Sequence, residues 1–465
     1  MLSGCGQTIP VTKLKLKNMS SNRRNFIKKA SVGAAGIAFS GSINAMSASG
    51  YSRILGANDK INCAIIGVRS RAKAHIKAIH TDSNAKIIYS CDVDDKIIEE
   101  HNEWCKKNIG YVPKVEKDFR KVLEDKKVDA VFIATPEHWH APMAILALQA
   151  GKHVYVEKPC SHNPYENTLL VEAQKKYGKK VQMGNQQRSA KSSALAVKEI
   201  NEGIIGDVFK GEAYYSNNRD SIGTGKKIQV PSTLDWEMWQ GPAIREDYRD
   251  NIHPYNWHWF KNWGTGEVHN NGTHEIDICR WALGVDLPDS VTSYGGKYAY
   301  DDDWEFVDNQ QVTYKFGDDK FITWTGHSRG LIMPNQPGRG ITIYGSKGII
   351  TLSRGGYQLY DLGGNQIKDV KEDGDQSTGT NTRGEGVLDV NHVSNFFAGI
   401  REDKSLNSDI KDASVTTMLC HLGNMAQDAG ETIKIDTTTG KVLNNDKVMK
   451  DWWKREYAPG WEPKL

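Results

Sequence analysis

The sequence predicts an α/β fold whose N-terminal part is a doubly wound parallel sheet. Between residues 60 and 157, short apolar runs alternate with helix-like stretches at a pitch that is typical of such a sheet. The length of 465 residues is too great for one compact core, so a second domain is expected to follow.

The composition indicates a soluble globular protein, because 25% of the residues are charged and 38% are hydrophobic. The formal net charge of +3 is due to residues 1–50, which hold seven Lys and Arg and no Asp or Glu. The rest of the chain has 53 basic residues against 57 acidic ones, which argues against nucleic-acid binding. The seven cysteines are scattered without a C-x-x-C pair, so no disulfide or zinc framework is expected.

The N-terminus has the pattern of an export signal. Residues Ser21–Lys28 hold two adjacent arginines and a hydrophobic pair, and the weakly apolar stretch Ala30–Ala38 follows them. This resembles a twin-arginine signal, so residues 1–50 are expected to be a targeting segment, disordered or removed, on a periplasmic protein. The alternative is a disordered basic tail. The apolar stretch is too short and too rich in Gly and Ala for stable membrane insertion.

Four apolar runs predict the strands of the first sheet, and four helix-like stretches connect or follow them. The expected strands are Lys60–Gly67, Ala85–Asp92, Val128–Ala134 and His153–Glu157. The expected helices are Ala72–His80, Asp95–Lys107, Lys117–Glu124 and Pro142–Gln149.

The turn after the first strand corresponds to the phosphate-binding fingerprint G-x-G-x-x-G, but only its first glycine, Gly67, is present. Arg69 stands where the backbone normally approaches a pyrophosphate. Its side chain could crowd the phosphates, bend away from them or bind them. Asp92 ends the second strand 25 residues after Gly67, near the spacing of a carboxylate that binds ribose hydroxyls. That role would favour NAD over NADP, while the alternative for Asp92 is an ordinary turn residue.

Polar residues follow the third and fourth strands at what should be the ligand-binding edge of the sheet. Thr135 and Pro136 end the third strand, and His140 lies near the start of the next helix. Glu157 and Lys158 end the fourth strand, and the following proline disfavours helix at Lys158. Lys158 is therefore expected to stay extended at the carboxyl edge, where open α/β sheets bind ligands.

Together these motifs resemble the Gfo/Idh/MocA family of oxidoreductases, named for glucose–fructose oxidoreductase and inositol dehydrogenase. The matching pieces are Ala134-Thr135-Pro136 with His140, Ala150–Val154 leading into Glu157-Lys158-Pro159, Gln182–Arg188, Asp235–Pro242, Gly272–Asp277 and Leu419–Asn424. The likeness runs from about residue 55 to the end of the chain.

The resemblance implies a Rossmann NAD(P)-binding domain at residues 55–182. It also implies an α+β substrate and oligomerisation domain at residues 183–465, with an open, mainly antiparallel sheet that makes a homo-oligomer. Strand-like runs fit this second domain at Phe209–Ser216, Ser290–Tyr298, Gln310–Phe316, Phe321–His327, Gly340–Tyr344 and Gly348–Leu352. Late helices are expected at Val390–Gly399 and Asp412–Gly430, and a mobile surface loop at Asp361–Gly386.

The family's chemistry is hydride transfer between a sugar or cyclitol hydroxyl and nicotinamide. The resemblance gives NAD as the cofactor, with NADP less favoured. The residues expected to bind it are Gly67, Arg69, Asp92, Thr135, Pro136, His140, Glu157, Lys158 and Gln187.

The resemblance assigns catalysis to Lys158 and His274. The stretch Thr265–His274 matches a family motif G-G-x-x-x-D-x-x-x-H, with Asn270 at the acid position. His274 is expected to act as the base. Lys158 is expected to stabilise the developing alkoxide, and Glu157 to orient Lys158. If the segment is helical, Asn270, His274 and Asp277 share one face and could converge. The expected substrate-binding residues are Lys158, Arg188, Trp257, Asn270, His274 and Asp277.

No metal site is expected, since the histidines at 253, 258, 269 and 274 fit no standard zinc pattern. An exported dehydrogenase has no supply of free dinucleotide, so it must keep its cofactor and restore it in each cycle. The expected function is therefore an exported oxidoreductase acting on a carbohydrate or cyclitol hydroxyl. One alternative is an NAD-dependent glycosidase, which oxidises the ring transiently and needs a further base such as His140, His258 or His269. The other alternative is a non-catalytic sugar- or partner-binding protein.

Overall fold

The computed structural model describes residues 60–330, 337–373 and 386–465. All of them belong to one compact unit, Leu55–Leu465. The expected signal segment, residues 1–50, lies outside the described residues. None of the described helices has the length and apolar character that a membrane crossing requires.

The first sheet is six-stranded and parallel, which confirms the predicted doubly wound fold. Its strands lie in the order β3-β2-β1-β4-β5-β6. The strand order reverses between β1 and β4, and such a reversal opens a crevice at the carboxyl ends of the strands. The strands are β1 (Ile61–Ile66), β2 (Ala85–Cys91), β3 (Lys114–Glu116), β4 (Ala130–Ile133), β5 (His153–Val156) and β6 (Val181–Met183).

Helices α3 (Ser70–His80), α4 (Asp95–Ile109), α5 (Phe119–Glu124), α6 (His140–Gln149) and α7 (Pro164–Tyr177) connect these strands. Burial explains the apolar runs, because every residue of β4 is buried. The sequence analysis missed α7 although its boundaries are well marked. Asn163 caps its first turn, Pro164 is its first residue, and Gly178 ends it in the left-handed conformation.

The second sheet has nine strands in the order β14-β13-β12-β11-β7-β10-β9-β8-β15. All neighbouring pairs are antiparallel except β7 with β10, so the expected mainly antiparallel sheet is confirmed. The strands are β7 (Val208–Ser216), β8 (Ser290–Gly296), β9 (Asn309–Phe316), β10 (Lys320–His327), β11 (Arg339–Gly345), β12 (Gly348–Ser353), β13 (Gly356–Tyr360), β14 (Gln366–Lys371) and β15 (Ile433–Lys434).

The loop expected at Asp361–Gly386 is in part wrong. Residues Gln366–Lys371 form β14, which pairs with β13 at the edge of the sheet. None of its residues is buried, so its side chains carry no apolar pattern that sequence could reveal. Residues 374–385 of the expected loop lie outside the described residues.

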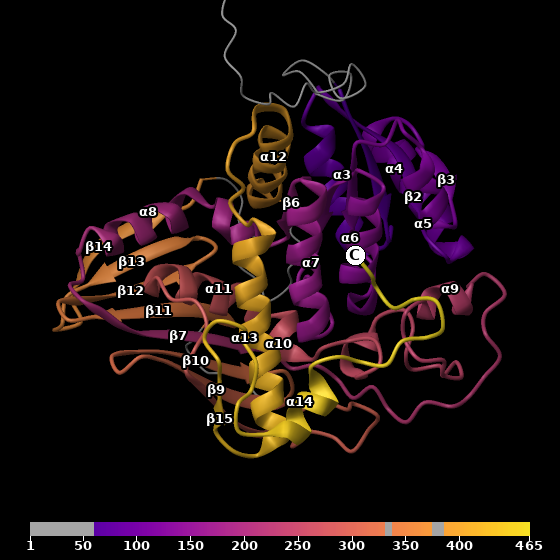
Figure 1. The fold of residues 1–465 in the computed structure, drawn as a ribbon. Coiled ribbons are helices and arrows are strands. Elements are labelled where there is room, and N and C mark those ends of the chain that lie inside the picture. Colours follow the sequence, from indigo (N-terminus) through magenta and orange to yellow (C-terminus); the bar gives the residue numbers. More distant parts are fainter. Residues whose placement is uncertain (1–59, 331–336, 374–385) are drawn as a thin grey trace, which may run out of the picture. The chain divides into compact units, whose positions relative to one another are not determined.

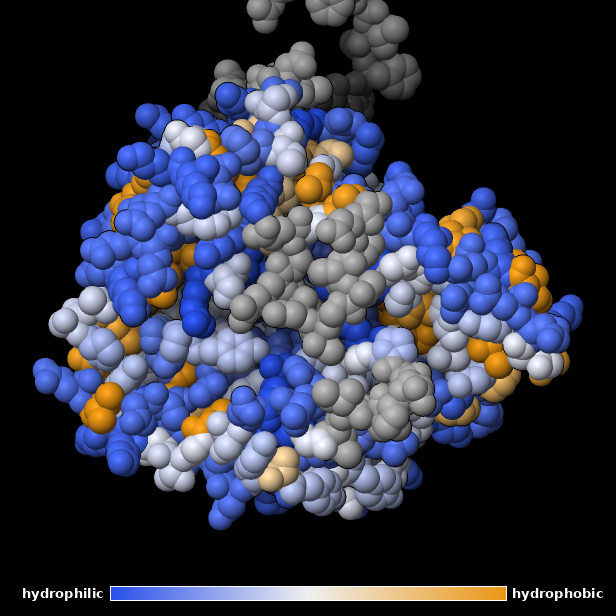
Figure 2. Space-filling model, turned by 180° about the vertical axis from the view of Figure 1, so that it is seen from behind, coloured by the Kyte–Doolittle hydropathy of each residue, from blue (hydrophilic) through white to orange (hydrophobic). Residues whose placement is uncertain are grey.

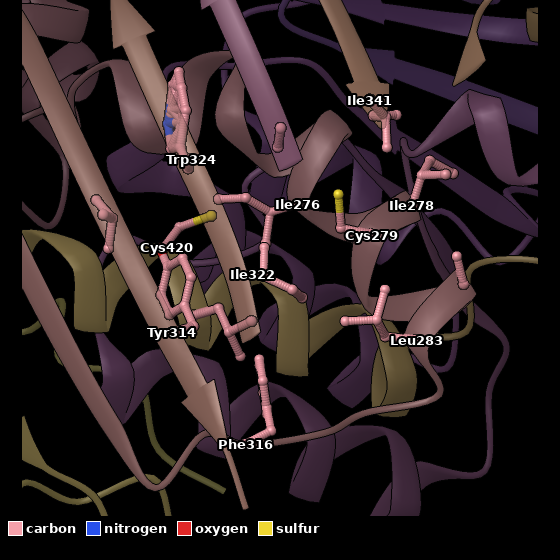
Figure 3. Close-up of a cluster of buried hydrophobic side chains, with 14 of the residues drawn as sticks. Ile276, Ile278, Cys279, Leu283, Tyr314, Phe316, Ile322, Trp324, Ile341 and Cys420 are labelled. Atoms are coloured by element: carbon pink, nitrogen blue, oxygen red, sulfur yellow. The ribbon is translucent and has the colours of Figure 1, made fainter. Parts of the chain in front are cut away.

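One face of the large sheet is covered by helices α8 (Lys191–Asn201), α11 (Gly272–Leu283) and α13 (Ile410–Ala429). Figure 1 shows α11 and α13 beside this sheet. Buried residues alternate along the strands and meet the apolar residues of the helices. Figure 3 shows this core, with Ile276, Cys279 and Leu283 of α11 facing Tyr314, Ile322 and Trp324 of the strands. The fold also contains three short helices, α9 (Trp236–Gln240), α10 (Glu267–Asn270) and α14 (Asp446–Trp452).

Helix α12 (Val387–Glu402) follows the large sheet in sequence but packs in the core of the small one. It lies beside α3 (Figure 1). The ring of Phe396 lies edge-on to Phe132 of β4, with centroids 5.7 Å apart, and 5.9 Å from Tyr155 of β5. The core of the first sheet is thus completed by residues from the last fifth of the chain. Outside the cores, the face drawn in Figure 2 is mostly hydrophilic, with hydrophobic side chains in small groups.

Replacing Phe396 with Ala is expected to lower the free energy of unfolding by about 3–5 kcal/mol, because the ring is fully buried and its loss leaves a cavity. Denaturant unfolding of both proteins measures the difference. Tyr294→Ala is the control, since this side chain is 73% exposed and its loss should change stability little. An unchanged unfolding free energy in Phe396→Ala would show that α12 is not part of the cooperative core.

Candidate functional site

A cavity of about 470 Å³ lies at the carboxyl ends of β1, β2, β4 and β5. One side is formed by the turns that follow these strands, including Gly67, Asp92, Thr135 and Lys158. The other side comes from the second part of the chain and is lined by Trp257, His258, Asn270, His274 and Arg354. The cavity therefore lies at the point where the strand order of the small sheet reverses.

The turn after β1 has the close approach that a dinucleotide needs. Gly67 has φ +81°, and a Cβ added there would lie 2.6 Å from the carbonyl oxygen of Ala134, so only glycine fits. The Asp92 carboxylate accepts backbone hydrogen bonds from Val68 and Val93 at 2.9 and 2.8 Å. Burial raises the pKa of Asp92, and these bonds oppose the rise. This cradle fits NAD, with the acid placed to bind ribose hydroxyls.

Three positions were possible for the Arg69 side chain relative to the phosphates. In the structure its guanidinium is turned toward the backbone at Pro254. Its Nη1 donates a hydrogen bond to the carbonyl oxygen of Pro254 at 2.9 Å. The first turn of α3 starts at Ser70 with no side chain capping it. Its backbone N–H groups are therefore available for an anion such as a pyrophosphate.

His140 connects the ends of two strands at the cavity wall. Its Nδ1 lies 2.6 Å from the carbonyl oxygen of Pro159, and its Nε2 lies 2.8 Å from that of Thr135. A neutral imidazole can donate to only one of these oxygens. Burial lowers the pKa of His140, although both carbonyls oppose that shift. The ring thus fixes the positions of Thr135 and Lys158-Pro159 relative to each other.

Glu157 is held as a carboxylate by several donors. Its Oε1 accepts a hydrogen bond from Arg71 Nε at 2.8 Å and from Gln186 Nε2 at 3.2 Å, and His75 Nε2 lies 3.0 Å away. Burial alone would raise the pKa of Glu157, but Arg71 and His75 outweigh it and hold the pKa well below its usual range. Glu157 is therefore a fixed negative charge beside Lys158.

Lys158 spans the cavity from the first sheet to the second part of the chain. Its ammonium donates to the backbone oxygen of Asn270 and, at 3.1 Å, to the Asn270 side-chain oxygen. Burial lowers the pKa of Lys158, while Glu137, Glu157 and Glu267 raise it. Asn270 thus positions the amine, as an amide at the acid position can.

Glu137 is a functional candidate that the sequence analysis missed. It lies in a short 3₁₀ helix, Glu137–Trp139, directly after Pro136, and it lines the cavity. Its Oε2 accepts a hydrogen bond from the hydroxyl of Thr265. Burial raises the pKa of Glu137 to about 7, although Thr265 and Lys158 lower it. The signal was its position, four residues after the last residue of the apolar strand β4.

His274, in the first turn of α11, lines the cavity as a neutral imidazole. Burial lowers its pKa well below the usual range, and the cations Arg354, Lys158 and Arg339 lower it further. Arg354 also lines the cavity and was missed by the sequence analysis. It stands in the turn between β12 and β13, where no local pattern marks it.

Trp257 lines the cavity together with His258, on which it stacks with ring centroids 3.6 Å apart and planes 18° apart. His258 Nδ1 lies 2.6 Å from the carbonyl oxygen of Tyr255. The flat face of this pair is suited to the C–H face of a sugar ring.

Arg188, Asp277 and Gln187 are not among the residues that line the cavity. Arg188 and Asp277 form a buried ion pair, with Nε–Oδ2 and Nη2–Oδ1 distances of 2.7 and 2.9 Å. Gln187 points toward the carbonyl oxygen of Ser353 at 3.4 Å. Asn270 and His274 both line the cavity, but the expected convergence with Asp277 does not form, because Asp277 binds Arg188 instead.

No group of three or more His, Cys, Asp or Glu within the described ranges is arranged to hold a metal ion.

Comparison with known proteins identifies both parts of the chain. Residues 61–185 match a family model described as "Oxidoreductase family, NAD-binding Rossmann fold", and residues 194–351 match one described as "GFO/IDH/MocA C-terminal domain". Together the two models match more than half of the chain.

Similar sequences include several glycoside hydrolases. A Glycosyl hydrolase family 109 protein of Parabacteroides distasonis is 26% identical over 320 residues, which cover 64% of this chain and 67% of that protein. An alpha-N-acetylgalactosaminidase of Tannerella forsythia is 28% identical over 240 residues, 48% of this chain and 51% of that protein. The match to a Shewanella pealeana relative spans 46% of its length.

The solved structure of a levoglucosan dehydrogenase in complex with NADH and levoglucosan is similar in fold. The TM-score is 0.63 and the identity 19%, over 81% of this chain and 99% of that one.

Replacing Asp277 with Asn is expected to lower the free energy of unfolding by about 3 kcal/mol, because it removes a charge from a buried ion pair. The loss of unfolding free energy should lie near the lower end of the range for buried ion pairs, because Arg188 keeps a second carboxylate. Asp412 Oδ2 lies 3.0 Å from Arg188 Nη2. Denaturant unfolding measures it, and Asp451→Asn, which breaks the exposed Lys447–Asp451 pair, is the control. Unchanged stability with weaker substrate binding would instead support the expected substrate-binding role.

Proposed function

Because the chain belongs to the Gfo/Idh/MocA family of NAD-binding oxidoreductases, we propose that it is a glycosidase that oxidises a ring hydroxyl transiently and ends each turnover with NAD restored. The observation that supports this most is Glu137. A simple dehydrogenase needs one acid/base group at the reacting hydroxyl, whereas this route needs a second base. Glu137 lines the same cavity as Lys158 and His274 and has a pKa of about 7.

A bound NAD, held at Gly67 and Asp92, would supply reversible hydride chemistry at the hydroxyl-bearing carbon. The side chains of the protein handle the protons and the charge. The ammonium of Lys158, held by Asn270, stabilises the negative charge that develops on the hydroxyl oxygen. The neutral imidazole of His274 accepts the hydroxyl proton.

Once the hydroxyl carbon has become a carbonyl, the C–H bond on the neighbouring carbon is acidified. Glu137 is close to half ionised at neutral pH, which suits a group that must both accept and return a proton. Removal of this proton allows the glycosidic oxygen on the next carbon to leave. Water adds there, and the carbonyl is reduced again, so the overall reaction is hydrolysis. The glycoside hydrolases among the similar sequences support this route.

A second candidate is the expected net oxidoreductase acting on a carbohydrate or cyclitol. It needs only Lys158, His274 and a cofactor that is reoxidised by a second sugar. The similar fold of an aldose–aldose oxidoreductase of Caulobacter crescentus is compatible with it (TM-score 0.61, 16% identity, 81% of this chain and 100% of that one). The fitted cradle at Gly67 and Asp92 disfavours a binding protein without a cofactor.

We further propose that the protein is exported by the twin-arginine route to the periplasm and forms a homo-oligomer through the open face of the large sheet. The pattern at Ser21–Lys28 supports export. The open face carries half-buried side chains such as Thr323, Tyr344 and Ile349, and a partner subunit could cover them.

The purified protein is expected to release nitrophenol from a nitrophenyl glycoside with no net rise in NADH absorbance. Lys158→Met should keep its fold and its bound NAD and lose about 100- to 1,000-fold in rate, since the oxyanion loses its cation. A panel of α- and β-linked nitrophenyl sugars, followed at 400 nm and 340 nm, measures both products. Accumulation of NADH in step with substrate would select the oxidoreductase, and an unchanged rate in Lys158→Met would refute its role.

The rate at low substrate is expected to rise with pH through about 7, because Glu137 must lose its proton before it can act as a base. Glu137→Gln should abolish nitrophenol release but retain exchange of the carbinol hydrogen with the cofactor, which deuterium-labelled substrate reveals. Loss of both reactions would contradict a role for Glu137 in the elimination step alone. Nitrophenol release with an unchanged pH profile in Glu137→Gln would remove Glu137 from the mechanism.

A further inference from the structure

We propose that the substrate of this enzyme carries an anionic group, a carboxylate or a sulfate ester, which the guanidinium of Arg354 binds. The inference rests on the proposed function, since it places this group on the sugar that occupies the cavity. It goes further in assigning the class of sugar, an acidic one, and the residue that selects it.

Arg354 is a cavity-lining arginine that has no ion-pair partner in the part of the chain that the structure describes, although the more distant Glu275 and Asp389 act on its charge. It stands between Ser353, the last residue of β12, and Gly356, the first of β13. Its Nε is buried and has no hydrogen-bond partner, and among the described residues no carboxylate lies within ion-pair distance of it. A guanidinium whose Nε is buried without a hydrogen-bond or ion-pair partner is costly to maintain. A ligand with two anionic oxygens would satisfy it in the paired geometry that arginine favours.

The neighbouring arginines differ from Arg354 in this respect. Arg71 pairs with Glu157 and Asp389, and Arg339 Nη2 lies 2.6 Å from Glu275 Oε1. Their charges are therefore compensated by the protein itself. The missing counterion of Arg354 is a property of this one position and not of the cavity wall as a whole.

The charges around His274 place the anion at the substrate end of the cavity. Arg354, Lys158 and Arg339 all act on the His274 imidazole, and Arg354 is the strongest of the three. At the opposite end, Asp92 is influenced by backbone N–H groups and by Asp94. Arg354 is thus a neighbour of the proposed base. Because Arg71 in the first turn of α3 also acts on Arg354, the measurement of NAD affinity distinguishes a sugar anion from the cofactor pyrophosphate as its ligand.

Titration calorimetry of the NAD-loaded protein tests this directly. The probes are D-glucuronate and D-galacturonate, galactose 6-sulfate, and the neutral sugars glucose and galactose. At least one anionic sugar is expected to bind about tenfold or more tightly than its neutral parent. Arg354→Met should abolish that preference without weakening neutral-sugar binding or NAD affinity and without lowering the melting temperature, and Arg354→Lys should keep part of the preference. Arg120→Met, at an exposed arginine, is the matched control.

Equal affinity for acidic and neutral sugars would overturn the proposal. So would a loss of NAD affinity in Arg354→Met, which would assign the guanidinium to the cofactor, or an equal loss for both sugar classes. Preference for the uronates alone or for the sulfate alone identifies which anion is read. Because these are binding measurements, failure of every nitrophenyl glycoside to react would count against the proposed glycosidase and leave this result standing.

Discussion

The hydrogen bonds from Lys158 to Asn270 are the interaction on which the site depends. They join the carboxyl edge of the small sheet to the helix α10 that precedes α11, so one side chain fixes both walls of the cavity. The amine approaches the cavity because Pro159 keeps the chain from continuing as a helix and because His140 ties the following carbonyl to Thr135. A small change in the position of either sheet would therefore displace the Lys158 amine within the cavity.

Two carboxylates beside this lysine are given opposite properties by their surroundings. Glu157 receives Arg71, His75 and Gln186 and is held ionised. Glu137 is buried, accepts hydrogen bonds from Thr265, and has a pKa of about 7. Environments that separate the pKa values of neighbouring acids commonly separate their roles. Glu157 therefore supplies a fixed negative charge, whereas Glu137 can exchange a proton.

The fold could largely be predicted from sequence, because buried parallel strands leave continuous apolar runs and helices lie between them. Strands β3 and β6 were missed since three residues are too few to show a pattern. At the site, residues next to strand ends could be found, whereas Arg354 could not, because a turn of the second sheet approaches the first only through tertiary packing. Helical periodicity correctly brings Asn270 and His274 to one cavity, but it could not show that Asp277 pairs with Arg188, which comes from a distant part of the chain.

The position of α12 has a consequence for synthesis of the chain. The small sheet is encoded by residues before 184, yet its core is closed by a helix that begins at Val387. While the chain emerges from a ribosome, this sheet must wait for the entire large sheet before its apolar surface is sealed. A dinucleotide site that matures so late can capture its cofactor only near the end of translation, and a truncated product would expose bare hydrophobic surface instead of forming a smaller working domain.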